Sequence, residues 1–151
     1  MGIKMTGVPQ IMRQINKQVN SLLSEDRIEY WLDWCGEMLR KKALETRTFK
    51  DQTGNLASSI GYVVLHDGKI VSNGGLQKVK DGDEGIREGK AYLDNLAEKW
   101  GRKGWVLIVS AGMDYAAYVE ARGRVVLSSA ELEAPKILGE AVKYMIMESK
   151  L

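Results

Sequence analysis

Hydrophobic residues in the first third of the chain recur every three or four positions, the spacing that places them on one face of a helix. A first stripe covers residues 8–23. A second begins after Ser24 and two acidic residues, a pattern typical of a helix start. We therefore predict a helix from about Glu25 to Thr46, behind a helical arm over residues 1–24; one bent helix and two separate helices both fit. The second stripe consists of Ile28, Trp31, Leu32, Cys35, Met38, Leu39 and Ala43.

Shorter apolar runs in the middle of the chain predict strands. A strand is expected over Ser58–Leu65, after a turn-rich connector, and Asp67-Gly68 is a strong signal for a two-residue hairpin turn. The return strand is expected over Lys69–Ser72, with Asn73-Gly74-Gly75 breaking it. The continuous apolar run within Trp105–Ser110 predicts a buried strand.

Residues 75–104 separate the hairpin from that buried strand, and we interpret them as an insertion. Their first part is polar and rich in glycine. Gly85 and Gly89 weaken any helical start before Lys90, because glycine is a poor helix former. A short amphipathic helix follows, marked by Ala91, Leu93, Leu96, Ala97 and Trp100.

The last quarter of the chain predicts one more strand, over Gly123–Leu127, and a C-terminal helix with an apolar stripe over residues 137–146. Pro135 lies near the expected start of that helix, where proline is tolerated. The order of elements predicts a single α+β domain over residues 1–151. We expect a small, mainly antiparallel β-sheet packed against a long N-terminal helix and a C-terminal helix, with an inserted loop–helix segment.

Composition narrows the possible chemistry. The chain of 151 residues has 22 basic and 20 acidic residues, a net charge of +2 that does not support strong nonspecific binding of phosphate over the whole surface. Cys35 is the only cysteine and His66 the only histidine, so a disulfide within the chain is excluded and a His/Cys zinc site has too few ligands. We expect no cofactor, no metal and no membrane-spanning helix.

Two segments carry most of the functional information. In the first, residues 51–60, Asp51 and Thr53 can bond nearby backbone N–H groups and Gly54 can supply a positive φ. In the second, residues 112–123, tyrosines surround a one-turn helix or a tight bend that ends near Glu120. A lone carboxylate without a partner acid, histidine or metal is weak support for acid–base chemistry. Taken separately, both segments are also explained as packed connectors.

Taken together and in this order, the two segments resemble the tail-completion, or head–tail joining, proteins of long-tailed bacteriophages. The family shows an Asp-Thr-Gly-x-Leu-x-x-Ser-Ile-like segment after the first long helix, then a Gly-x-x-Tyr-Ala-x-Tyr-Val-Glu-x-Gly-like segment before a closing helix. The resemblance covers roughly residues 25–148. The matching residues are Thr53, Gly54, Leu56, Ser59 and Ile60 in the first segment, and Tyr115, Ala116, Tyr118, Val119, Glu120 and Gly123 in the second.

The chain also departs from the family pattern. Gln52 separates Asp51 from Thr53, and Ala121-Arg122 adds one residue before the final glycine. Residues 125–129 replace the usual proline–aromatic approach to the last helix. These differences bear on the subfamily and the ring size more than on the fold.

The resemblance implies a structural virion protein of the phage or prophage neck, made in the cytoplasm of the bacterial host, and not an enzyme. Its copies would form a ring, a hexamer in preference to a dodecamer. The ring would lie between the head-side connector and the tail-tube or tail-terminator proteins, with DNA passing through its channel. The second motif and residues 75–104 are the candidates for contacts between neighbours.

Two other classes of function stay open. Lys99, Arg102 and Lys103, beside Trp100 and Trp105, form a small basic–aromatic cluster that would suit a nucleic-acid-binding module. The same cluster is also explained as a solvated helix end beside core tryptophans. A hydrolase using Glu120 with Asp114 is the third hypothesis, and it lacks a nucleophile, a base and a metal site.

Overall fold

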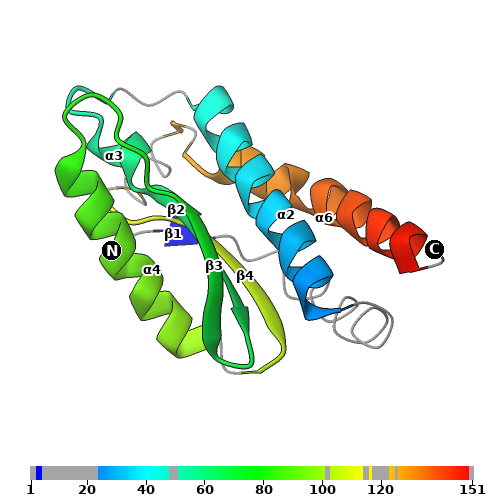
Figure 1. The fold of residues 1–151 in the computed structure, drawn as a ribbon. Helices are drawn as coiled ribbons and strands as arrows, with labels where there is room; N and C mark the ends of the chain where they lie inside the picture. The colour runs from blue at the N-terminus through cyan, green and yellow to red at the C-terminus, as the bar shows by residue number, and fades with distance from the viewer. Residues whose placement is uncertain are drawn as a thin grey trace.

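The structure is a computed structural model, and it describes residues 3–4, 24–47, 51–100, 103–113, 116, 123–124 and 126–149. Helices and a small sheet build an α+β fold, as the sequence predicts (Figure 1). In chain order the elements are β1 (Ile3–Lys4), α2 (Glu25–Thr46), α3 (Asn55–Ser58), β2 (Ile60–His66), β3 (Lys69–Gly75), α4 (Asp83–Trp100), β4 (Trp105–Ala111) and α6 (Ser128–Ser149).

The sheet has the strand order β1-β4-β2-β3, and every neighbouring pair is antiparallel. The expected hairpin joins β2 and β3. Asp67 and Gly68 at its turn have positive φ values of 49° and 85°, as a tight two-residue turn requires. The prediction that β3 ends at Ser72 is wrong, because pairing with β2 continues to Gly75. Gly74 pairs with Tyr62, and a Cβ at Gly74 would press on the tyrosine ring, so the glycine permits this pairing.

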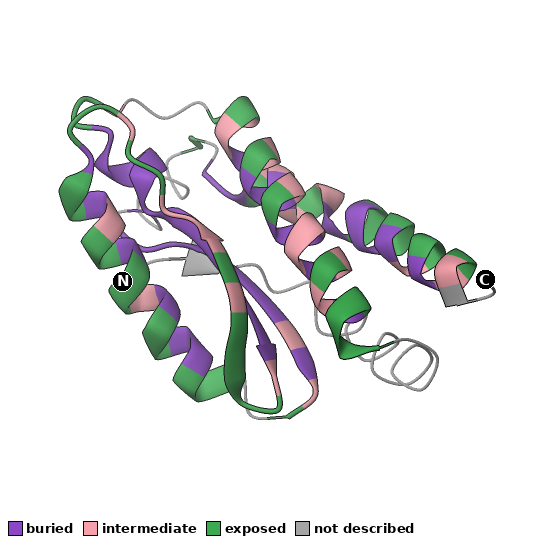
Figure 2. Cartoon of the chain, in the orientation of Figure 1, coloured by how far each residue is buried: buried purple, intermediate pink, exposed green. Residues whose placement is uncertain are grey.

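Helices cover both faces of the sheet (Figure 1). α2 packs against one face and runs antiparallel to α6, while α4 covers the other face. Side chains of β2 and β4 alternate between the two layers. Figure 2 shows buried residues along these strands and in patches along the helices. Tyr62, Val64, Trp105, Leu107 and Val109 belong to the α2 and α6 core, whereas Val63, Leu65 and Ile108 pack with the α4 residues Leu93, Leu96 and Ala97.

Two predictions about the middle of the chain are wrong. Ser58 lies in the short helix α3, and the strand begins only at Ile60. α4 begins at Asp83, before both Gly85 and Gly89, and not near Lys90. Both helix positions require glycine. A Cβ at Gly85 would overlap the backbone of Asn55, and a Cβ at Gly89 would overlap the backbone of Ser59. The segment interpreted as an insertion thus supplies the layer on the second face of the sheet.

Both ends of the chain also differ from expectation. The described residues of Gly123–Leu127 form no strand. The carbonyl of Leu127 accepts the N–H of Glu131 at 2.9 Å, so the chain is already entering α6 there. Pro135 consequently lies inside α6 and not near its start. Within the expected N-terminal helical arm, Ile3–Lys4 is a strand paired with β4, and the stripe over residues 8–23 lies outside the described part.

Candidate functional site

The first motif forms a structural joint that begins with Asp51. Its carboxylate accepts the N–H of Leu56 at 3.3 Å and that of Ala57 at 2.8 Å, which caps the start of α3. Thr53 Oγ1 accepts the N–H of Asn55 at 3.3 Å. Gly54 has a φ of 79°, and a Cβ there would overlap the carbonyl of Val79. The predicted turn chemistry of this segment is therefore confirmed.

The same joint holds α4. Asn55 Nδ2 donates to Glu84 Oε2 at 3.3 Å, and Asn55 Oδ1 accepts the N–H of Gly85 at 3.0 Å. Ser58 Oγ accepts the N–H of Val79 at 2.8 Å. Ser59 Oγ donates to the carbonyl of Leu56 at 2.7 Å, and the motif residues Leu56, Ser59 and Ile60 are buried. All these groups bond or pack within the protein, so the motif fixes where α4 begins.

Most of the second motif lies outside the described residues. This applies to Tyr115, Tyr118, Val119 and Glu120, and also to Asp114, the proposed partner of Glu120 in a hydrolase. Ala116 is buried, and its N–H donates to the carbonyl of Met113 at 3.0 Å. Gly123 has a φ of 81° and open space where a Cβ would be.

The basic–aromatic cluster is divided by the fold. Lys99 and Trp100 end α4, and Lys103 follows; all three are exposed, Trp100 by 59%. Trp105 is only 1% exposed and stacks on His66, with ring centroids 4.1 Å apart. Trp105 therefore belongs to the core and cannot stack on a nucleic-acid base. Arg102 lies outside the described residues.

A polar cluster between α2 and the β2–β3 hairpin was missed by sequence reasoning. The hydroxyl of Tyr62 lies 2.7 Å from Asp33 Oδ1 and 3.0 Å from Glu37 Oε1, and Ser72 Oγ donates to Asp33 Oδ1 at 2.5 Å. Burial, followed by these two carboxylates, raises the pKa of Tyr62 above its usual value. The phenol is thus a hydrogen-bond donor at neutral pH and not a base. The available signal was the spacing of Asp33, Glu37 and Arg40 along one side of the helix.

Arg40 extends this cluster to the edge of the sheet. Its Nη2 donates to Gln77 Oε1 at 3.0 Å, and its Nη1 lies 3.9 Å from Glu37 Oε2. The arginine side chain is largely buried, and it lies beside Gly75, where a Cβ would meet its Cδ. The cluster joins α2 to the last residues of β3 and holds that end of the strand in place.

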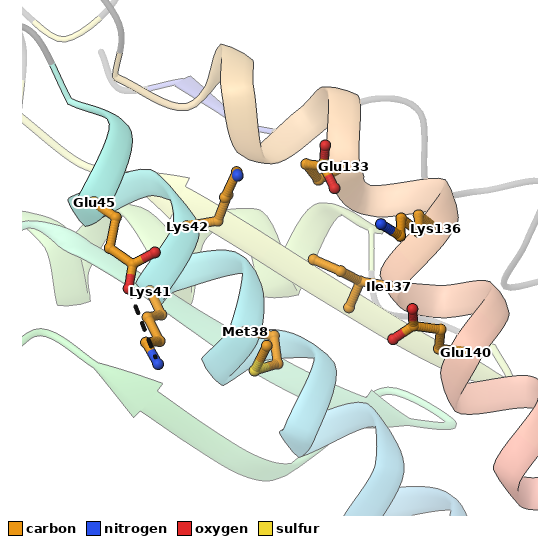
Figure 3. A pocket seen from close by; sticks show the side chains of 8 residues that line it. All are labelled: Met38, Lys41, Lys42, Glu45, Glu133, Lys136, Ile137 and Glu140. Atoms are coloured by element: carbon orange, nitrogen blue, oxygen red, sulfur yellow. Dashed lines mark ion pairs between the residues drawn. The ribbon is translucent and has the colours of Figure 1, made fainter.

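A shallow groove of about 290 Å³ lies between α2 and α6 (Figure 3). Its polar lining alternates in sign, with three lysines and three glutamates, and Lys41 pairs with Glu45 at 4.0 Å. A mixed lining of this kind creates no field of one sign that would attract a polyanion or a polycation. The groove is lined by Met38, Lys41, Lys42, Glu45, Glu133, Lys136, Ile137 and Glu140.

Aromatic rings gather where α2 begins and α6 ends. Trp31 packs edge-on against Tyr30 and Trp34 and stacks on Tyr144 at 5.1 Å. Glu148 accepts hydrogen bonds from Trp31 Nε1 at 3.1 Å and from the guanidinium of Arg27. These contacts give the two helices a rigid junction. Trp31 and Trp34 were expected in core or interface packing, and both pack against the main core.

Within the described ranges, no three His, Cys, Asp or Glu side chains lie close enough together to hold a metal ion. The helices found there are too short or too polar to cross a membrane. Comparison of the chain with protein-family models, with curated proteins and with solved structures finds no match.

Proposed function

We propose that this chain is a structural protein of a phage or prophage neck, where it joins head to tail as a ring around the DNA channel. The pair of ordered motifs, in the stretch between the long helices α2 and α6, carries this proposal. In the virion its partners are further copies of itself, the head-side connector and the tail-tube or tail-terminator proteins. A hexamer fits the resemblance better than a dodecamer.

The described contacts support a scaffold role. Polar groups of the first motif form hydrogen bonds with α3, with α4 and with the segment before α4. The clustered carboxylates of Asp33 and Glu37 accept hydrogen bonds from side chains that join α2 to the sheet. A body fixed in this way on both faces of its sheet provides the rigid wedge that a closed ring requires.

Inactivating the gene in the genome that carries it tests the proposal directly. We expect electron microscopy of the induced lysate to show filled heads and free tails that are not joined. Adding the purified full-length chain to that lysate should restore joined, infectious particles. Joined particles in the absence of the gene product would contradict the proposal, as would a gene with no portal, capsid or tail-tube genes near it.

A nucleic-acid-binding module remains the second candidate function, and the exposure of Lys99, Trp100 and Lys103 favours it. Binding of a single-stranded oligonucleotide should then weaken steeply with salt. Arg102→Ala and Lys103→Ala should abolish that binding. Affinity that is independent of salt, or unchanged in the variants, would exclude this use of the cluster.

A further inference from the structure

The sheet has two edges at which, within the described part of the chain, no further strand pairs. One edge is β3 and the other is β1. An open edge presents backbone N–H and C=O groups that another strand can bind. The two edges belong to strands that are far apart in sequence and are separated in the sheet by β4 and β2.

The two halves of β3 differ as binding surfaces. The first half carries Lys69 and a bulge, since Leu65 pairs with Ile70 but Val64 with Ser72, which leaves Val71 as the extra residue. A bulge and a lysine are two devices that protect an edge against further pairing. The second half, Ser72–Gly75, keeps a regular register with β2 and contains no charged residue. It is therefore the part of the edge that lacks these protective devices, although Ser72, Gly74 and Gly75 are only partly exposed.

Strand directions make the two edges complementary. Because β1, β4, β2 and β3 alternate in direction, β1 runs opposite to β3. If copies of the chain follow one another around an axis, β1 of one copy reaches β3 of the next in antiparallel orientation. When a sheet has an even number of alternating strands, its two edge strands run in opposite directions, so the edges of neighbouring copies meet antiparallel. With an odd number of strands, the edges would meet parallel.

We propose that β3 of one copy pairs with β1 of the next copy, so that the sheet continues across each subunit boundary of a ring. This inference rests on the proposed function and specifies its interface. The contact is heterologous, as ring closure requires. Two strand residues make a short seam, so a single contact is weak and the closed ring supplies the stability.

Cross-linking of engineered cysteines tests the pairing. Lys4→Cys and Asn73→Cys are combined in the full chain, which is treated with a short bismaleimide at increasing protein concentration. We expect a ladder of covalent oligomers that ends at the ring. Both substitutions are made in a Cys35→Ala background, since the chain has one native cysteine, which is buried. Each single variant in that background is a matched control and should give no species above a dimer, because one cysteine per copy cannot extend a chain of links. A double variant that gives no ladder would overturn the proposed interface.

A proline substitution tests the same edge without a cross-linker. The N–H of Leu76 donates to the carbonyl of Ile60 at 2.9 Å, so by alternation the N–H of Asn73 points away from β2. Asn73→Pro should remove an outward donor, keep the fold, and weaken self-association at least tenfold, while Asn73→Ala should leave it unchanged. Circular dichroism and thermal unfolding verify that the proline variant is folded. Equal association of the two variants would contradict the proposal.

The outcomes separate the interface from the function. Rings that form without a cross-linked ladder would exclude the β3–β1 seam and leave the neck function standing. Joined phage particles in the absence of the gene product would refute the neck function whatever the cross-linking shows.

Discussion

Gly85 and Gly139 both lie inside helices, but only Gly85 faces the backbone of another segment. A Cβ at Gly85 would overlap the carbonyl of Asn55, whereas nothing lies within 4 Å of a Cβ at Gly139. We expect Gly85→Ala to destabilise the protein by about 2 kcal/mol or more, since α4 must move away from α3. Gly139→Ala should stabilise it by about 0.8 kcal/mol, the difference in helix propensity. Urea unfolding measures both, and a loss of stability in both variants would contradict the assignment.

Asp51 concentrates several interactions in one residue. Its carboxylate caps α3, and its carbonyl accepts a hydrogen bond from Lys80 Nζ at 2.8 Å. Asp51→Ala should lower the free energy of unfolding by about 1 kcal/mol, because two backbone donors lose their partner. The exposed neighbour Gln52 gives the matched control, and Gln52→Ala should be neutral in the same thermal or urea unfolding experiment.

Cys35 gives a prediction in alkali. Burial raises the pKa of its thiol from 9.0 to about 12, so the folded protein keeps the thiol neutral where the unfolded chain ionises it. The stability that comes from keeping the Cys35 thiol neutral is therefore fully present below pH 9. It is lost as the pH rises from 9 towards 12. At pH 8 we expect Ellman's reagent to react on the order of a hundredfold more slowly with the folded protein than in concentrated urea. Equal rates would show that the thiol is accessible.

At the scale of elements, one carboxylate makes the polar contacts between the start of α2 and the end of α6. Hydrogen bonds from Arg27 and then from Trp31 hold the pKa of Glu148 below its ordinary value of 4.5. The stabilisation is present above that ordinary value and is lost as the pH falls through the lowered pKa. Glu148→Gln should therefore reduce the melting temperature by a few degrees at neutral pH and have a smaller effect in acid. The exposed Glu98→Gln on α4 is the control, and equal losses at both pH values would contradict the role of this carboxylate.

Elements defined by local patterns were predicted well. The bounds of α2 follow from its apolar stripe and its acidic first turn, and the hairpin follows from Asp67-Gly68. α4 was predicted too short, because the reason for Gly85 lies thirty residues away at Asn55 and no periodicity reveals it. The three apolar residues 125–127 are too few to distinguish a strand from the approach to a helix.

For the candidate site too, local features were predicted and contacts between elements were not. The sequence indicates the turn chemistry of Asp51, Thr53 and Gly54, but not that this turn holds the start of α4. The polar cluster around Tyr62 was missed because Asp33 and Glu37 lie on a different element and meet the tyrosine only after α2 packs on the sheet. Contacts between elements are therefore the part that a single sequence does not predict.

For the whole molecule, we expect a monomer or a weak oligomer in isolation. The edge available on β3 is short, and in the proposed neck assembly ring closure would add contacts with the connector and the tail that the purified chain lacks. Light scattering at micromolar concentration should give a mean mass near that of one chain, which increases with concentration. A large ring that is stable at every concentration would contradict this expectation.

Gly82, Gly85, Gly89 and Gly112 are among the described glycines at which an added methyl group would overlap a neighbouring segment. Saturation mutagenesis should therefore find these positions nearly intolerant of any replacement, while many residues are accepted at position 139. Apolar core residues can often replace one another, but these positions accept only glycine. Their spacing should therefore stay the same even in chains whose apolar residues differ. Distant relatives could therefore be sought by the spacing of these glycine positions, because the fold tolerates the fewest replacements there.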